Sequence, residues 1–261
     1  VVHSACAVAG TFDAGRAALE AFMAVNRDGT ANLAREVLKH PGLRMVHVSS
    51  TAAMGTPTAP VVNEDSPCNP TTPYQRSKRA AEEALLDLHA NQGLDVVIVR
   101  AGKDRSELRQ LFRLVKRGVF PAIGDALRVQ KPLIHIDDLV QALLLATEKG
   151  RSGGIYLVHS DGGHTLGDII AAAANLAGVR RGYLPVPVAA ARAVASVLAV
   201  AHRFAPDWNP PLTHERIALF TADRRIDISR ARNELGYAPT KQTPAAILTD
   251  TWQYHVRSGH L

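Results

Sequence analysis

Short apolar runs alternate with segments of helical spacing along most of the chain, and this order restricts the fold more than any other feature. The apolar runs are VVHSAC, LRMVHVSS, LDVVIVR and GIYLVHS, at residues 1–6, 43–50, 94–100 and 154–160. Apolar residues recur at helical spacing over 15–39, 74–91, 136–150 and 164–178. Strands that are separated by helices pair in parallel, because each helix carries the chain back across a face of the sheet. The sequence therefore predicts an α/β fold with a parallel sheet.

The segments between these elements give further expectations. The stretch 56–73 holds five prolines and is predicted to be a long loop, a kind of segment that often serves function. SELRQLFRLVKRG reads as an amphipathic helix, and PLIHIDDLVQALLLATEKG as a strand that enters a helix. Asp137 and Asp138 would cap that helix, and Thr165 is the expected N-cap of the next one.

Composition narrows the class of partner. The chain has 261 residues, 46% of them hydrophobic, which suits one large globular domain or two small ones. The net charge of +6 would suit an anionic ligand, yet the basic residues are scattered and only 5% of residues are aromatic. No nucleic-acid partner is therefore expected. Two cysteines, Cys6 and Cys68, indicate free thiols and a reducing compartment, so the cytoplasm is the expected location.

The longest apolar stretch runs from Leu184 to Ala201. Two prolines near its start and Arg192 within it argue against a membrane span. The favoured interpretation is an alanine-rich helix packed in the protein interior, with a peripheral membrane contact as the lesser alternative.

Tyr74 and Lys78, in PYQRSK, stand four residues apart at the start of a predicted helix. Residues at this spacing share a helix face, so the Lys78 ammonium would stabilise the phenolate form of Tyr74 and suit the phenol to proton transfer. The spacing alone is weak evidence, because chance produces about 0.13 such pairs in a chain of this composition. Ser49, Ser50 and Thr51 add hydroxyls where a predicted strand ends, at the edge where parallel sheets bind ligands.

Five ordered segments resemble motifs of the extended short-chain dehydrogenase/reductase family. They are VVHSAC, NRDGTANL, VHVSSTAAMG, PYQRSK and IHIDDLVQALLLA, which together span about residues 1–158. The family includes nucleotide-sugar epimerases, dehydratases and 3β-hydroxysteroid dehydrogenases. The tail, PPLTHERIALFTADRRIDISRARNELGYAPT, is more similar to the steroid dehydrogenase branch.

The resemblance implies a role for each matching residue. Tyr74 would be the general acid/base, Lys78 its activator and a ribose ligand, and Ser50 the hydroxyl that polarises the substrate. Asn26 would support the active site, although a purely structural hydrogen-bonding role remains equally open. The residues implied in cofactor binding are Ala5, Cys6, Ser49, Tyr74, Lys78 and Ala101. The cofactor would be NAD or NADP, and pairing through the helices that carry NRDGTANL and PYQRSK would make a homodimer.

The family's usual sequence and this one differ at two places. Family members begin with a strand, a glycine-rich turn and a helix that binds pyrophosphate, and VAGTFDAG has neither the spacing nor the position of that turn. The expected fold is therefore a Rossmann-like doubly wound sheet that is incomplete at its N-terminus, with a smaller C-terminal substrate-binding portion. After LDVVIVR, the chain passes almost directly into SELRQLF, which shortens a loop that normally borders the substrate.

These features lead to one division of the chain and one function. Residues 1–100 and 132–158 would form the dinucleotide-binding part, and 101–131 and 159–261 the substrate-binding portion. We expect an NAD(P)-dependent oxidoreductase that acts on a secondary alcohol or ketone, with sterol-like or other hydrophobic alcohols as the first substrate class. Two alternatives stay open, a nucleotide-sugar epimerase or dehydratase and a catalytically silent binding module. His135 is expected to be a satisfied core or crevice histidine, and no metal site is expected because the other histidines lack ligand spacing.

Overall fold

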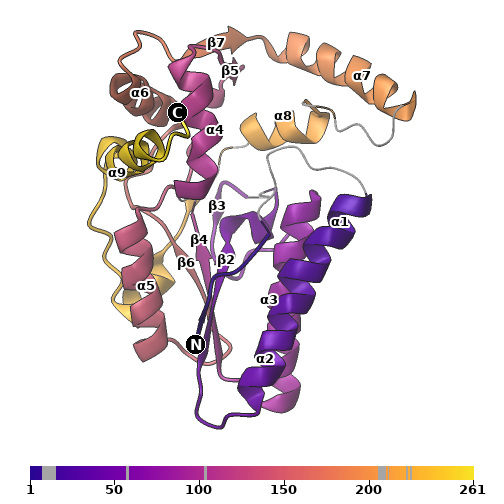
Figure 1. Ribbon diagram of the computed structural model, residues 1–261, viewed down its shortest axis with the longest axis vertical. Helices are drawn as coiled ribbons and strands as arrows, with labels where there is room; N and C mark the ends of the chain where they lie inside the picture. Colours follow the sequence, from indigo (N-terminus) through magenta and orange to yellow (C-terminus); the bar gives the residue numbers. More distant parts are fainter. Residues whose placement is uncertain are drawn as a thin grey trace.

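The computed structural model is built around a parallel four-stranded sheet in the order β1-β2-β4-β6 (Figure 1). Its strands are β1 (Val2–His3), β2 (Met45–Ser50), β4 (Val96–Ala101) and β6 (Ile155–Val158). The structure describes residues 1–7, 16–56, 59–102, 105–204, 210, 212–221, 223 and 225–261. Parallel pairing throughout this sheet confirms the α/β fold that the alternating pattern predicts.

Helices cover both faces of the sheet (Figure 1). One face carries three helices joined in part by a π-helical segment: α1 (Arg16–Phe22), η1 (Met23–Gly29), α2 (Thr30–Leu38) and α3 (Pro73–Gln92). Helix α5 (Ile136–Lys149) covers the other face. Strand β4 is buried along its whole length, because it has a strand on each edge and a helix layer on each face. The sheet is therefore doubly wound, as predicted.

Alternate residues of the strands pack into different cores. Val97 and Val99 of β4 belong to the core that includes Ala142 and Ala146 of α5. Their neighbours Val96 and Ile98 pack with the leucines of α3 on the opposite side. Since side chains alternate along a strand, each helix layer receives its own apolar face.

The predicted helix over 74–91 forms as α3, and its start is fixed by local hydrogen bonds. Thr72 is the N-cap, and its hydroxyl accepts a hydrogen bond from the Gln75 N–H, while the Gln75 side chain bonds back to the Thr72 backbone. Pro73 takes the first helical position, where a missing N–H costs nothing. This capping box sets the backbone two residues before Tyr74.

The C-terminal part packs as a second layer of elements above the sheet (Figure 1). Helices α4 (Arg105–Lys116), α6 (Leu166–Ala177) and α9 (Pro244–Arg257) share a core around Phe112. Two short parallel sheets join distant segments, and they pair β5 (Phe120–Ile123) with β7 (Tyr183–Val186) and β3 (Val61–Val62) with β8 (Arg225–Ile226). The remaining elements are η2 (Thr51–Met54), η3 (Ala126–Arg128), α7 (Val188–Phe204), α8 (His214–Thr221) and η4 (Ala231–Leu235).

The first strand is shorter than predicted. Only Val2 and His3 of the expected strand 1–6 pair with β2. The backbone N–H and C=O of Ala7 are instead bonded to the side chain of Asn26 at 2.7 and 3.1 Å. At Ala7 the backbone is thus held by a side chain of η1 rather than by a neighbouring strand. The helix predicted over 15–39 is confirmed, since helical structure runs without a break from Arg16 to Leu38.

The strand predicted at the start of PLIHIDDLVQALLLATEKG is wrong. Residues 132–135 form no strand, and Pro132 has no N–H to give to a ladder. The N-cap of α5 is His135, whose side chain accepts a hydrogen bond from the Asp137 N–H at 3.2 Å. His135 is 2% exposed and its Nε2 lies 3.2 Å from the Asp250 carboxylate, which confirms a satisfied crevice histidine.

Asp137 and Asp138 lie in the first turn of α5, as predicted, where negative charge favours the helix dipole, but neither of them is the N-cap. Asp138 binds another segment instead. Its carboxylate is 1% exposed and accepts hydrogen bonds from the Thr240 N–H, the Thr240 hydroxyl and the Lys241 N–H at 2.8, 2.8 and 3.1 Å. The acidic side chain is used to fasten the C-terminal segment onto α5. Thr165, by contrast, is confirmed as the N-cap of α6, in a capping box with Asp168.

Two sequence features fall on residues outside the described ranges. The first is VAGTFDAG, at residues 8–15. The second is the short connection after β4, which includes Lys103 and Asp104. The predicted loop 56–73 is confirmed in its described part up to Thr72, with β3 as its regular segment there, and its last residue, Pro73, begins α3.

The helix predicted within Leu184–Ala201 forms as α7, but the expectation that it is packed in the interior is wrong. Among its residues only Ala191 and Ala195 are buried. Val197 is 68% exposed and Phe204 86% exposed. The alanine-rich pattern predicts the helix correctly, because alanine favours helices whether they are buried or exposed. No helix among the described residues combines the length and the apolar character needed to cross a bilayer.

Candidate active site

The carboxyl ends of three strands line up across the sheet and bring the predicted hydroxyl to its edge. Ser50 pairs in register with Ala101, and Ala101 with Val158. Ser50 is 9% exposed, and its Oγ accepts a hydrogen bond from the Ala52 N–H at 3.1 Å as the chain turns into η2. Ala101 is 5% exposed. Strand ends of an open parallel sheet are where ligands bind, so this edge is the first candidate for a site.

Lys78 is buried beside the same strand. Its side chain is 3% exposed, and its Nζ donates a hydrogen bond to the Val48 carbonyl at 3.3 Å, two residues before Ser50. Tyr74 lies one helical turn earlier on α3 and is half-buried. Its ring meets the edge of the Phe22 ring, with centroids 6.0 Å apart. The structure thus places a hydroxyl, a phenol and an ammonium along one strand end and the helix start beside it.

Two histidines lie close to the Lys78 ammonium. His3 bonds through Nε2 to the Thr30 hydroxyl at 2.9 Å, and its ring centroid is 5.3 Å from that of His47. Burial and the nearby Lys78 charge lower the pKa of His3, and the same two causes hold the pKa of His47 well below its ordinary value. Both imidazoles are therefore neutral at neutral pH, and the positive charge of this cluster belongs to Lys78.

Asn26 connects the end of β1 to the helix that carries Tyr74. Besides its two bonds to Ala7, its amide donates to the Ser77 hydroxyl at 2.9 Å. The side chain is 2% exposed and belongs to the π-helical segment η1. A π-helical turn widens the helix locally, and such turns recur at functional sites. In the described structure, Asn26 holds backbone and Ser77 rather than the phenol itself.

A buried ion pair holds α3 against the sheet, and sequence reasoning missed it. Glu82 follows Tyr74 and Lys78 on one face of α3, because the three residues are four apart. Its carboxylate accepts two hydrogen bonds from Arg100 of β4, at 2.9 and 2.7 Å, and one from the Ser49 hydroxyl at 2.6 Å. Arg100 and Glu82 are both fully buried. The available signal was the charged residue that ends the apolar run VVIVR.

The predicted cofactor residues lie at different depths. Ala5 is exposed and Cys6 is a half-buried free thiol, both beyond the end of β1. Ser49 is 3% exposed, with its hydroxyl bonded to Glu82, and it faces away from Ser50 because neighbours on a strand alternate. The ends of β1, β2 and β4 thus present backbone, and Lys78 presents an ammonium, along one edge.

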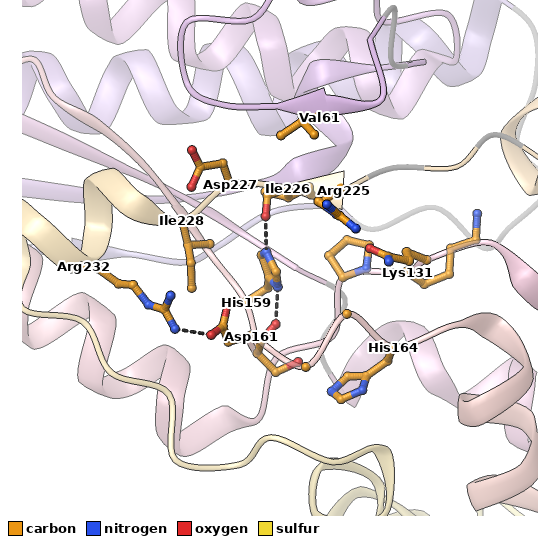
Figure 2. A pocket seen from close by; sticks show the side chains of 15 residues that line it. Val61, Lys131, His159, Asp161, His164, Arg225, Ile226, Asp227, Ile228 and Arg232 are labelled. Atoms are coloured by element: carbon orange, nitrogen blue, oxygen red, sulfur yellow. Dashed lines mark hydrogen bonds and ion pairs between the residues drawn. The ribbon is translucent and has the colours of Figure 1, made fainter.

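A cavity of about 490 Å³ lies further along this edge (Figure 2). His159, directly after β6, stands in its wall and bonds through Nε2 to the Ile226 carbonyl at 3.0 Å. Burial lowers the pKa of His159, so its ring is neutral there. Charged side chains also line the cavity, namely Lys131, Asp161, Arg225, Asp227 and Arg232. Figure 2 shows Arg232 paired with Asp161 across one wall.

Two buried polar atoms in this cavity have no protein partner in the described structure. They are the Oγ of Ser160, whose side chain is 1% exposed, and the Nε2 of His164, which is 7% exposed. Buried polar groups are nearly always hydrogen-bonded, so these two atoms indicate a site for water or a ligand. Adjacent strands are about 4.8 Å apart, which puts the end of β6 roughly 10 Å from Ser50 along the sheet edge. Among the cavity residues just named, Lys131 and Asp161 lie outside every segment singled out in the sequence, and the others lie in such segments without any signal that marks them as site residues.

Among the described residues no three histidine, cysteine or acidic side chains are grouped closely enough to hold a metal ion.

Comparison with known proteins places these features in a wider group. Residues 1–158 match the NAD dependent epimerase/dehydratase family. The chain is 32% identical over 237 residues to sterol demethylase protein B of Methylococcus capsulatus, covering 87% of this chain and 71% of that protein. It is 27% identical over 170 residues to UDP-glucose 4-epimerase of Vibrio cholerae, covering 62% of this chain and 52% of the relative.

Solved structures with a similar fold include enzymes that act on nucleotide sugars. DesIV, a dTDP-glucose 4,6-dehydratase of Streptomyces venezuelae solved with NAD and TYD bound, superposes with a TM-score of 0.72 at 23% identity. The match covers 98% of this chain and 72% of that structure. At this identity the likeness concerns the fold alone.

Proposed function

Because the chain belongs to the NAD-dependent epimerase/dehydratase family of extended short-chain dehydrogenases/reductases, we propose that it moves hydride between a nicotinamide cofactor and a secondary alcohol or ketone. The observation that carries this proposal is the placement of Lys78, which is buried and bonded to the Val48 carbonyl two residues from Ser50. The family's motifs were the sequence evidence for membership, and the match over residues 1–158 agrees with them.

Each side chain has a distinct part in the proposed reaction. Tyr74 takes the hydroxyl proton of the alcohol, or returns it to the ketone in the reverse direction. Ser50 holds the same oxygen by a hydrogen bond and polarises the bond to carbon. The Lys78 ammonium stabilises the negative charge that Tyr74 carries between these transfers.

The residues at the sheet edge fit a nicotinamide cofactor, either NAD or NADP. An ammonium has three N–H donors, and in the described structure Lys78 uses one of them on the Val48 carbonyl. The other two N–H donors of Lys78 suit ribose hydroxyls. The backbone near Ala5, Cys6 and Ala101 would contact the cofactor. The bound nicotinamide supplies a hydride acceptor or donor. Asn26 is proposed as a positioning residue that fixes β1 and α3 around it.

The cavity beside His159 is proposed to receive part of the substrate. Its volume of about 490 Å³ suits a small molecule, and Ser160 and His164 would bond polar groups. The relative named sterol demethylase protein B favours a substrate with a large apolar body. We therefore propose a sterol-like or other hydrophobic alcohol with a polar end in this cavity. Residues 1–100 and 132–158 would serve the cofactor, and 101–131 and 159–261 the substrate.

The charged lining of the cavity favours one alternative. Lys131, Arg225 and Arg232 would also suit the phosphates of a nucleotide sugar, and UDP-glucose 4-epimerase is among the relatives. Such an enzyme would convert a sugar nucleotide without net change in cofactor. Net reduction of NAD or NADP by a hydrophobic alcohol would instead support the oxidoreductase. We further propose a cytoplasmic homodimer, for which the free thiols Cys6 and Cys68 support the location.

The test compares two matched tyrosine variants of the full-length protein. Tyr74→Phe removes the proposed acid/base, and Tyr254→Phe makes the same chemical change on α9, at a side chain that is 41% exposed. With a panel of secondary alcohols, Tyr74→Phe should lower kcat by about a hundredfold or more, since acid/base catalysis contributes at least that factor. Tyr254→Phe should keep it. Unchanged turnover in Tyr74→Phe would overturn the mechanism, and absence of any turnover in the unaltered protein would favour a silent binding module.

A further inference from the structure

Helix α7 presents its apolar side to solvent. Its buried residues, Ala191 and Ala195, pack with Ile123 of β5 and Ile217 of α8. At 100° per residue, the opposite arc of the helix is about 140° wide and holds only alanine, valine and phenylalanine. Its main members, all exposed, are Ala190, Ala193, Val194, Val197, Val200 and Phe204.

The distribution of apolar residues on α7 is the reverse of that on an ordinary surface helix. Surface helices place charged residues outward and apolar residues toward the core. Here Val194, Val197 and Val200 are 50, 68 and 53% exposed, and Phe204 is 86% exposed. A continuous exposed apolar face of this kind marks an interaction site. In Figure 1, α7 stands at the outer end of the C-terminal layer, far from the central sheet.

The charged residues of α7 and of the segment that leads into it are arginines. Between Asp168 and Asp207 the sequence holds four arginines and no Asp or Glu. Arg192 and Arg203 are exposed and lie along one border of the arc, about 40 to 60° from its edge. Arg180 and Arg181 precede β7 and are also exposed. A basic border beside an apolar face is the pattern of helices that lie on anionic lipid.

The occupant can be chosen from these charges and from the helix length. Helix α7 has 17 residues and is about 25 Å long, so it is shorter than the roughly 30 Å hydrocarbon core and cannot cross it. In a two-fold contact through α7, a second copy of the chain would set the same arginines against one another, with no Asp or Glu on α7 to pair with them. A bilayer surface with anionic headgroups supplies both an apolar layer and negative charge.

We propose that α7 docks the protein on anionic membrane surfaces, with Val197, Val200 and Phe204 in the headgroup boundary and Arg192 and Arg203 against lipid phosphates. The placement does not depend on the proposed reaction. If the substrate is a hydrophobic alcohol, the same contact brings the protein to the phase in which that alcohol dissolves.

The test is sedimentation of the full chain with vesicles of phosphatidylcholine alone or mixed with phosphatidylserine. The unaltered protein should sediment with the mixed vesicles, and raised salt should release it. Arg192→Gln with Arg203→Gln should weaken binding by about thirtyfold, from two arginine–lipid contacts. Val197→Glu with Val200→Glu should abolish binding, and these exposed sites should tolerate the change without loss of fold.

Leu144→Glu is the matched control. Leu144 is 59% exposed on α5, so the change has the same chemistry on another helix and should leave vesicle binding intact. Failure of the unaltered protein to sediment with mixed vesicles would overturn the proposal. So would equal loss in the control, or a light-scattering mass showing that the valine variant only converts a dimer to a monomer.

Discussion

At the scale of single residues, the ion pair between Glu82 and Arg100 explains how a helix start can be positioned for chemistry. Glu82 stands two turns after Tyr74 and one after Lys78 on α3. Arg100 reaches it from β4, and Ser49 from β2, so one buried carboxylate binds the helix to two strands. These hydrogen bonds resist small movements of α3 relative to the sheet.

Removing one member of this pair should be costly. Arg100→Leu leaves the buried Glu82 carboxylate with only the Arg79 guanidinium, 3.5 Å away, as an ion-pair partner in the described structure, and we expect a loss of about 3 kcal/mol in the free energy of unfolding. Glu82→Leu combined with Arg100→Leu should recover most of that loss, because neither charge then stays buried alone. Urea unfolding of the two variants measures the difference. A loss below about 1 kcal/mol in the single variant would contradict this account.

The buried histidine beside Lys78 gives a pH dependence with a definite sign. Burial and the Lys78 charge depress the pKa of His47 in the folded state, whereas in the unfolded chain it returns to near 6.5. Below that pH the unfolded chain binds the extra proton, so folding stability falls as pH falls from 7 toward 5. His47→Gln should reduce this slope by up to about 1.4 kcal/mol per pH unit. Identical slopes in urea unfolding at pH 7, 6 and 5 would count against the assignment.

At the scale of elements, two capping boxes offer a matched pair of helices. Thr72 begins α3, which carries Tyr74 and Lys78, and Thr165 begins α6, which carries none of the proposed catalytic residues. Either threonine changed to alanine should lower the free energy of unfolding by about 1 kcal/mol. The two variants should differ in kcat.

Thr72→Ala should lower kcat, because it loosens the turn that fixes Tyr74, whereas Thr165→Ala should leave kcat unchanged. Steady-state kinetics of both variants, at a temperature where both are folded, makes the comparison. Equal effects on kcat would show that the α3 cap serves stability alone.

The elements also show where the sequence is informative and where it is not. The parallel strands and the helices over 16–38 and 73–92 follow from local apolar spacing and were predictable. Pairing of β3 with β8 and of β5 with β7 joins segments far apart in sequence, and short strands leave too little pattern to detect. The same holds for Asp138, whose partner Thr240 is 102 residues away.

At the scale of the whole molecule, the site is a property of the sheet edge. Ser50, Tyr74 and Lys78 could be predicted as candidates from their motifs and spacing, and the structure places them on β2 and the adjoining α3. The cavity by His159 could not, because loops from β6, β8 and the segment before α5 meet only after folding. The exposure of α7 was equally hidden, since alanine and valine spacing does not say which face is covered.

The central claim is that this edge transfers hydride, and isotope transfer tests it most directly. The full-length protein would be incubated with NAD or NADP and secondary alcohols that carry deuterium on the carbinol carbon, followed by mass spectrometry of the nicotinamide. The account predicts deuterium in the reduced cofactor for the unaltered protein and its loss in Tyr74→Phe. Reduced cofactor without deuterium, or sugar-nucleotide conversion with no deuterium transfer from any alcohol, would contradict it.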